Sequence, residues 1–149
     1  EEGFRHDTVN AVLAEAGENP ALAARNVREL SGWIAREDWD KILAAYSRCV
    51  RITRDLQDRF EVNVKKMELK AEKALYDAYK KVRDHVKGSR SVNDFLSSFM
   101  EMIPAVNQFF DDVLVMDEDL SIRQNRLALL QDISALADGR ADFSELEGF

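Results

Sequence analysis

The sequence predicts an all-α protein, built as a bundle of about six helices, and three features support this. Apolar residues recur three or four positions apart along the chain, which places them on one face of a helix. No segment alternates apolar and polar residues for long enough to form a strand. The length of 149 residues suits one domain, so we expect a single core over residues 1–149.

Three helices are predicted in the first part of the chain. The first covers residues 4–16 and ends at Gly17, which we expect in a left-handed conformation. The second begins at Asn19-Pro20, because Asn caps helices and Pro fits the first helical position. The third covers about residues 38–56 and has a basic outer side. Its expected buried stripe comprises Trp39, Ile42, Tyr46, Cys49, Val50, Thr53 and Leu56.

Three more helices are predicted after a linker at residues 57–65. The fourth covers about residues 66–87, with Ala74 among its buried residues. Ser91 and Asp94 resemble a capping box at the start of the fifth helix. The apolar spacing of that helix continues through Pro104, so we expect a kink there.

The sixth helix covers about residues 119–138. An acid at its start, Asp117 or Asp119, is expected to cap it. Beyond Gly139, Phe143 and Leu146 are predicted to dock a short turn onto the core.

Charge is segregated along the chain. The net charge is −7, yet residues 41–90 hold 14 basic and 7 acidic side chains, whereas residues 1–40 and 91–149 are both acidic. A basic middle offers phosphate groups a binding region despite the negative total. A solvated face with internal salt bridges would give the same pattern, so charge alone leaves both interpretations open.

The residues that could bind nucleic acid lie in this basic middle. Cationic side chains attract phosphates, and two tyrosines three residues apart could stack unpaired bases, although they could also simply cover the core edge. Asp77 and Asp84 partly neutralise these cations. We expect the cations of the third and fourth helices to share one surface. The candidate RNA-binding residues are Arg48, Arg51, Arg54, Lys66, Lys70, Lys73, Tyr76, Tyr79, Lys80 and Arg83.

Catalytic and metal-binding patterns are absent from the sequence. His6 and His85 are the only histidines, and neither has a neighbour at metal-ligand spacing. No glycine-rich phosphate loop is present. The lone Cys49 lies on an apolar face, which indicates a buried thiol in a reducing compartment. We therefore predict no catalytic residue, no metal site and no cofactor in this chain.

The chain begins at Glu1 rather than Met, and it shows neither a leader nor an apolar run long enough to span a membrane. We expect a piece of a longer cytoplasmic protein that binds neither a membrane nor DNA.

Several blocks, taken in order, resemble one family. They are GFRHD at residues 3–7, AYSRCVRI at 45–52, AEKALY at 71–76, FFDDVLVMDEDLSIRQNRLALL at 109–130 and ADFSEL at 141–146. Together they resemble the DALR-type anticodon-binding domain at the C-terminus of the bacterial glycyl-tRNA synthetase β subunit. No block is a catalytic signature, but five in the same order are specific.

The resemblance implies a helical domain that binds the anticodon region of tRNA for glycine. The parent would be a glycine–tRNA ligase that uses ATP with Mg²⁺ outside this chain. Its other partners would be the rest of the β subunit and the α subunit, or a fused catalytic region. Arg123, Asn125 and Arg126 match the family's Arg-x-Asn-Arg-Leu block, and we expect them to hold the turn to Asp111, Asp112 and Asp117 rather than touch RNA.

Two alternatives remain at this point. Arginyl-tRNA synthetase carries a related domain. A non-enzymatic helical module that binds a protein partner would also fit the segregated charge.

Overall fold

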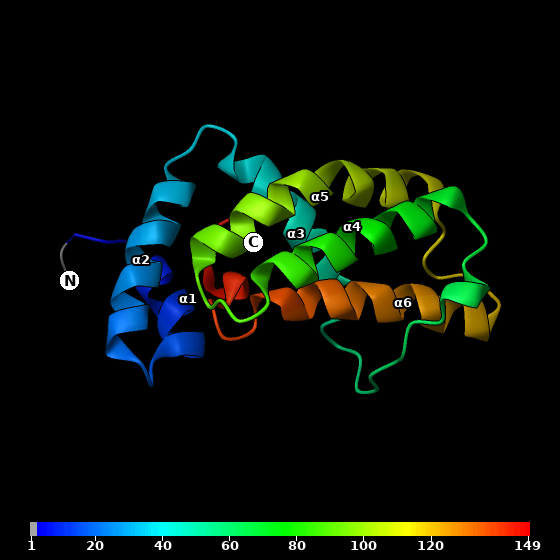
Figure 1. Ribbon diagram of the computed structural model, residues 1–149, viewed down its shortest axis with the longest axis horizontal. Helices are drawn as coiled ribbons and strands as arrows, with labels where there is room; N and C mark the ends of the chain where they lie inside the picture. Colours follow the sequence, from blue (N-terminus) through cyan, green and yellow to red (C-terminus); the bar gives the residue numbers. More distant parts are fainter. Residues whose placement is uncertain (1–2) are drawn as a thin grey trace.

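The computed structural model describes residues 3–149, and helices are the only regular secondary structure among those residues, which include no β-strand (Figure 1). This confirms the predicted all-α class with six α-helices. The elements are α1 (His6–Ala16), α2 (Pro20–Ile34), α3 (Trp39–Arg51), η1 (Val64–Lys66), α4 (Lys70–Val86), α5 (Val92–Asp112), α6 (Leu120–Ser134), η2 (Ala135–Ala137) and η3 (Phe143–Glu145).

Helices α1 and α2 form an antiparallel hairpin beside one end of the bundle (Figure 1). Asn19 caps α2 as predicted, because its side chain accepts a hydrogen bond of 3.1 Å from the Leu22 amide. Gly17 is not left-handed, so that prediction is wrong: its φ is −61° and its amide still bonds the Leu13 carbonyl. The capping of α2 at Asn19, rather than a left-handed glycine, separates the two helices.

The other four helices form the bundle. Helices α3 and α4 each pack against both α5 and α6, whereas α3 and α4 are not closely packed on each other. They therefore occupy opposite corners, and Figure 1 shows α3 passing behind α4 and α5. The core between them is fully buried at Phe99, Met102 and Leu130.

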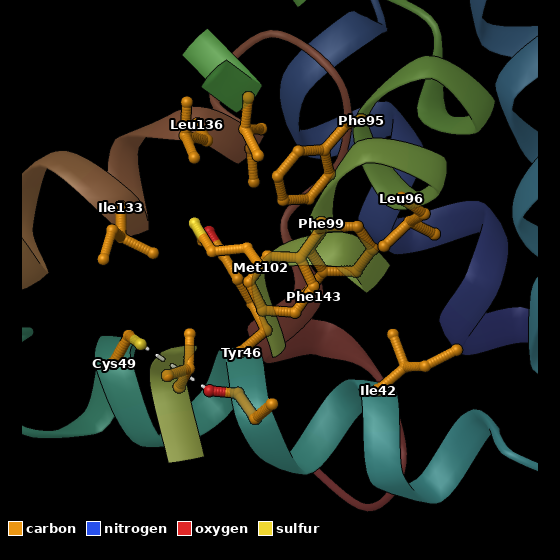
Figure 2. Packing of buried hydrophobic residues seen from close by; sticks show 14 of the residues in the cluster. Ile42, Tyr46, Cys49, Phe95, Leu96, Phe99, Met102, Ile133, Leu136 and Phe143 are labelled. Atoms are coloured by element: carbon orange, nitrogen blue, oxygen red, sulfur yellow. Dashed lines mark hydrogen bonds between the residues drawn. The ribbon is translucent and has the colours of Figure 1, made fainter. Parts of the chain in front are cut away.

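An aromatic cluster fills the centre of the protein (Figure 2). Tyr46 of α3 packs edge-on against Phe95, Phe99 and Phe143, with ring centroids 5.7, 5.6 and 5.3 Å away. Its hydroxyl donates a hydrogen bond of 2.5 Å to the Ser134 carbonyl, which satisfies the one polar atom of a buried ring. The predicted docking of the tail is confirmed, because Phe143 and Leu146 are buried.

Several helix boundaries differ from the prediction. Helix α3 ends at Arg51 and continues only as turns, so Leu56 is 37% exposed rather than buried. Helix α4 begins at Lys70, later than predicted, and Lys66 lies in η1 instead. Ala74, which was expected to be buried, lies on the exposed side of α4. Helix α6 ends at Ser134 and tightens into η2. Terminal turns often tighten in this way, which shortens the α-helix by a few residues.

The predicted N-caps of α5 and α6 are present. Ser91 accepts a hydrogen bond from the Asp94 amide, although the Asp94 carboxylate bonds Ser89 instead of reaching back to Ser91. Asp119 caps α6 by accepting from the Ser121 amide at 2.9 Å. Helix α5 is unbroken at Pro104, which is exposed; the bend expected there stays a prediction.

The chain between α3 and α4, residues 52–69, forms a strap along α6. The Asn125 side chain exchanges two hydrogen bonds with the backbone of Asn63, at 2.7 and 3.0 Å. The Gln131 side chain accepts from the Phe60 amide at 3.0 Å and donates to the Asp58 carbonyl at 2.8 Å. Because the strap covers the outer side of α6, residues 125–131 are all buried.

Arg140, at the C-terminal end of the bundle, is a buried cation that the sequence did not single out. It donates to the Leu136 carbonyl at 2.6 Å, to the Val86 carbonyl at 3.1 Å and to the Ser89 carbonyl. Burial lowers the pKa of Arg140, and the carbonyl groups offset part of that cost. Arg140 thus joins the end of α6 to the α4–α5 turn.

Candidate nucleic-acid interface

Helix α4 carries two stacked tyrosines between cations. The rings of Tyr76 and Tyr79 are 6.4 Å apart at an interplanar angle of 30°. The Lys80 ammonium lies 4.8 Å from the Tyr76 ring, and the Arg83 guanidinium lies 5.7 Å from the Tyr79 ring. This spacing follows from the helix, because residues three and four positions apart share a face. The group can offer both a π-surface and positive charge to a nucleotide.

The two tyrosines differ in how much ring they leave free. Tyr79 is only 8% exposed, whereas Tyr76 is half-buried. Burial raises the pKa of Tyr79, and the charge of Asp132 on α6 raises it further, while Arg83 and Arg59 oppose the shift. Tyr79 thus faces α6 and the strap, and Tyr76 is the better stacking platform.

Arg59 is a further cation beside this group, and it was missed in the sequence. It belongs to the strap and donates a hydrogen bond of 2.7 Å to Asp132. The charge of Arg59 lowers the pKa of Tyr79, opposing the charge of Asp132. The strap has no clear apolar period, so no sequence pattern pointed to Arg59.

The remaining cations of this side lie towards the start of α4. The Lys66 ammonium donates to the Ser121 hydroxyl at 2.6 Å. Lys70 and Lys73 are exposed, and neither forms an ion pair within residues 3–149. Two acids neutralise part of the charge further along, as expected: Asp77 lies 3.5 Å from Lys80, and Asp84 lies 3.3 Å from Arg83.

The arginines at the C-terminal end of α3 lie elsewhere. The Arg48 guanidinium lies 4.3 Å from the Phe110 ring of α5, and that of Arg51 lies 5.6 Å from the Phe149 ring. Arg54 follows α3 in an exposed turn. Since α3 and α4 occupy opposite corners, the expectation of one surface shared by both helices is wrong. The ten candidates form two groups, seven residues on the α4 side and three on the α3 side.

A cavity of about 480 Å³ lies between the end of α3, the strap and the C-terminal tail. Arg54 and Arg59 both line it, so it connects the α3 side with the strap. Acids line it too, and the pKa of Asp138 is raised by burial and then by the charge of Glu15. The cavity is therefore polar and of mixed charge.

Two residues of the Arg-x-Asn-Arg block, Arg126 and Asn125, hold neighbouring segments, but their partners differ in part from the prediction. Arg126 donates to the Leu114 carbonyl at 2.7 Å and lies 3.5 Å from Asp117, which confirms its role in the turn. Asn125 instead holds the strap. The predicted pairing with Asp111 and Asp112 is wrong.

Asp112 instead accepts from the Gln108 amide group at 2.5 Å, one turn earlier on its own helix. Arg123 is half-buried and forms no ion pair within the described residues.

The described residues were compared with the requirements of a metal site and of a membrane-spanning helix. Among residues 3–149, no three His, Cys, Asp or Glu side chains gather closely enough to hold a metal ion. In that same part of the chain, no helix combines the length and apolarity needed to cross a bilayer. Cys49 is buried as predicted, and burial raises the pKa of its thiol to about 12.

Comparison with known proteins agrees with the resemblance. Residues 42–139 match the model of the DALR anticodon-binding domain. The chain is 37% identical over 149 residues to the chloroplastic/mitochondrial glycine–tRNA ligase 2 of Arabidopsis thaliana, covering 99% of this chain and 14% of that protein.

Bacterial glycine–tRNA ligase β subunits are also similar. Those of Moorella thermoacetica and Myxococcus xanthus are 33% and 36% identical, and each alignment covers 98% of this chain and 22% of the relative. The chain thus spans less than a quarter of the length of these relatives. The matched region includes α4, α5, α6 and most of α3, and with it most of the bundle. The chain therefore belongs to the DALR anticodon-binding domain family.

Proposed function

We propose that this chain is the part of a glycine–tRNA ligase that binds the anticodon region of its tRNA. The observation that carries the proposal is the alignment of 98–99% of the chain with proteins named as glycine–tRNA ligases. These relatives favour glycine over the arginine alternative.

The α4 side is the surface best suited to the RNA. Unpaired loop bases are held by stacking and by contacts to phosphates, and both are available there. Tyr76 supplies the more exposed ring, and Lys70 and Lys73 on α4, with Lys66 in η1, continue the positive charge. Arg59 extends it across the strap. The arginines of α3 form a second, smaller group that the RNA would reach only around α6.

The domain supports ATP-dependent glycylation by holding the tRNA while the chemistry takes place elsewhere. ATP and Mg²⁺ would bind in parts of the ligase outside this chain. The catalytic region would lie in an α subunit or in a fused polypeptide. The compartment follows the parent enzyme: we expect the cytoplasm for a bacterial ligase, while the Arabidopsis relative is named for chloroplasts and mitochondria.

Titration of the chain with anticodon stem-loops tests the proposal. The stem-loop of a glycine tRNA should bind more tightly than that of an arginine tRNA and than an unrelated hairpin. Equal binding of all three would contradict a specific role. A protein-interaction module would show no preference for tRNA at all.

Charge-reversal variants test the contributions of the two cationic groups to RNA binding separately. Lys70→Glu with Lys73→Glu should weaken binding and reduce the slope of log K against log salt by about 0.7–0.9 per lost phosphate contact. Arg48→Glu with Arg51→Glu is the matched pair on the α3 side, and we expect a smaller effect. If only the α3 pair weakened binding, the α4 surface would be the wrong assignment.

A further inference from the structure

One end of the bundle exposes a group of large apolar side chains. Three segments meet at that end and supply these side chains (Figure 1). The segments are η1, the start of α4, and the α5–α6 linker together with the first residue of α6. We name this group the apolar end; its residues and exposed fractions are Val64 47%, Leu69 38%, Leu114 65%, Met116 54% and Leu120 53%. Clustered exposure of this kind marks an interaction site more often than scattered single residues do.

The apolar end is held rigidly from behind. Arg126 donates to the Leu114 carbonyl at 2.7 Å and to the Glu72 carboxylate at 3.2 Å. The same carboxylate oxygen accepts from the Leu69 amide at 3.1 Å. One buried ion pair therefore fixes both Leu69 and Leu114, so the surface is organised before any partner arrives.

The exposure is built into the linker. Buried and exposed residues alternate along the linker: Val113 and Val115 are each 6% exposed, whereas Leu114 and Met116 point outward. Val113 has extended backbone angles, and an extended chain directs successive side chains to opposite sides. The two valines anchor the linker while their neighbours remain available.

The charge beside the apolar end selects the class of partner. Asp111, Asp112 and Glu118 are exposed in or next to the linker, and none of them forms an ion pair within residues 3–149. Unpaired acids repel phosphates, so the linker side of the apolar end does not suit RNA, whereas Lys65 and Lys66 of η1 border its other side. The linker side suits a protein surface whose apolar side chains are bordered by Lys or Arg.

Longer relatives contain a source for such a surface. In the aligned glycine–tRNA ligases, 78–86% of the polypeptide lies outside the part matched by this chain. We propose that the apolar end docks against another part of the same ligase, through apolar side chains bordered by basic residues. This inference rests on the proposed function only in taking the chain as part of a ligase. The docked part would lie beside Lys66 and Lys70, and so beside the proposed RNA path.

Thiol labelling tests the docking directly. Met116→Cys places a reactive thiol in the apolar end, while the native Cys49 is buried and inert. Maleimide modification of the peptide containing residue 116 is compared in the isolated chain and in the complete ligase, without tRNA. We expect it to be about tenfold or more slower in the ligase, as for a covered site. Ser97→Cys, exposed on α5, corrects for general accessibility.

Each other outcome overturns the docking. Equal labelling at residue 116 in both proteins would show an uncovered surface. Slower labelling in the isolated chain at high concentration would indicate a second copy as the occupant, and protection only after tRNA is added would indicate RNA. The stem-loop titration reports on RNA binding separately, so its failure is distinguishable from a failure here.

A polar variant provides a second measurement. Leu114→Gln with Met116→Gln should lower the kcat/KM of the ligase for tRNA several-fold, about 3- to 10-fold, through weaker positioning of the domain. Stem-loop affinity of the isolated chain should stay within about twofold, since neither residue lies on the RNA face. Unchanged kcat/KM would count against the docking.

Discussion

The Arg126 guanidinium of α6 lies 3.2 Å from the Glu72 carboxylate of α4, and both side chains are almost completely buried. Glu72 also accepts from the amides of Glu68 and Leu69, which lead into α4. The pair therefore caps one helix and joins it to another. It places the cationic start of α4 against α6, which links packing to the proposed RNA surface.

Removing one member of this pair should destabilise the protein strongly. Arg126→Leu leaves the buried Glu72 carboxylate without its counter-charge, and breaking a buried ion pair in this way typically costs about 3–5 kcal/mol in the free energy of unfolding. Urea unfolding measures the change. Arg123→Leu is the matched control, since Arg123 is only half-buried and has no ion pair within residues 3–149; its effect should be about 0.5 kcal/mol or less. Equal losses in the two variants would contradict the role of the pair.

The strap should loosen when its two amide anchors on α6 are removed. Asn125→Ala and Gln131→Ala each remove two hydrogen bonds to the backbone, of Asn63 or of Phe60 and Asp58, at about 0.5–1.5 kcal/mol per bond, because these strap residues are exposed or half-buried. Limited proteolysis should then cut within residues 54–66 sooner than in the wild type, and the Asn63 and Phe60 amides should exchange faster. Gln124→Ala serves as the control, because Gln124 is half-buried and does not hold the strap. Unchanged cleavage in both anchor variants would show that other contacts retain the strap.

Tyr76 should contribute more to RNA binding than Tyr79. Tyr76→Leu removes the more exposed of the two rings and should weaken stem-loop binding by about 1–3 kcal/mol, the usual contribution of one stacked base. Tyr76→Phe keeps the ring and should bind like the wild type. If the Leu and Phe variants bound equally, stacking on this ring would be excluded. Thermal unfolding of both variants checks that the fold is intact.

Cys49 should make stability depend on alkaline pH. The folded state raises the pKa of its thiol to about 12 from an ordinary value of 9.0, so the buried thiol keeps its proton longer than the unfolded one. Its contribution is complete below about pH 9 and is lost as pH rises towards 12, by about 1.4 kcal/mol per pH unit. Urea unfolding of wild type and Cys49→Ala between pH 8 and about 11 isolates this effect, since other groups titrate equally in both. The difference in stability between the two proteins should shrink as pH rises; a constant difference would exclude it.

Helix positions were predictable because they depend on local signals. The caps at Asn19 and Asp119 and the turn at Gly139 can each be read from a few neighbouring residues. The exact residues at which the helices end were less predictable. Helix α3 stops at Arg51 although its apolar spacing continues, because the chain must turn there to cross α6.

The arrangement of the candidate site depended on packing between distant segments. Periodicity places Arg48 and Lys70 on outward faces, but it does not say which corners of the bundle α3 and α4 occupy. The path of the strap along α6 sets the corners of α3 and α4. Nothing in the composition of the strap predicted its contacts with α6. The pairing of Arg126 with Glu72 joins residues 54 positions apart, which is likewise beyond the reach of local spacing.

The diagonal placement of α3 and α4 also affects the order in which the protein folds. The α1–α2 and α4–α5 hairpins join neighbours in sequence and can close rapidly. Helix α3 reaches α6 only across a long loop, as the bond from Tyr46 to Ser134 spans 88 positions. We expect the closure of this loop to limit the rate of folding, and the strap to pack onto α6 afterwards. Kinetic φ-values, which compare the effect of a mutation on the folding rate with its effect on stability, should then be low at Asn63 and higher within the α4–α5 hairpin.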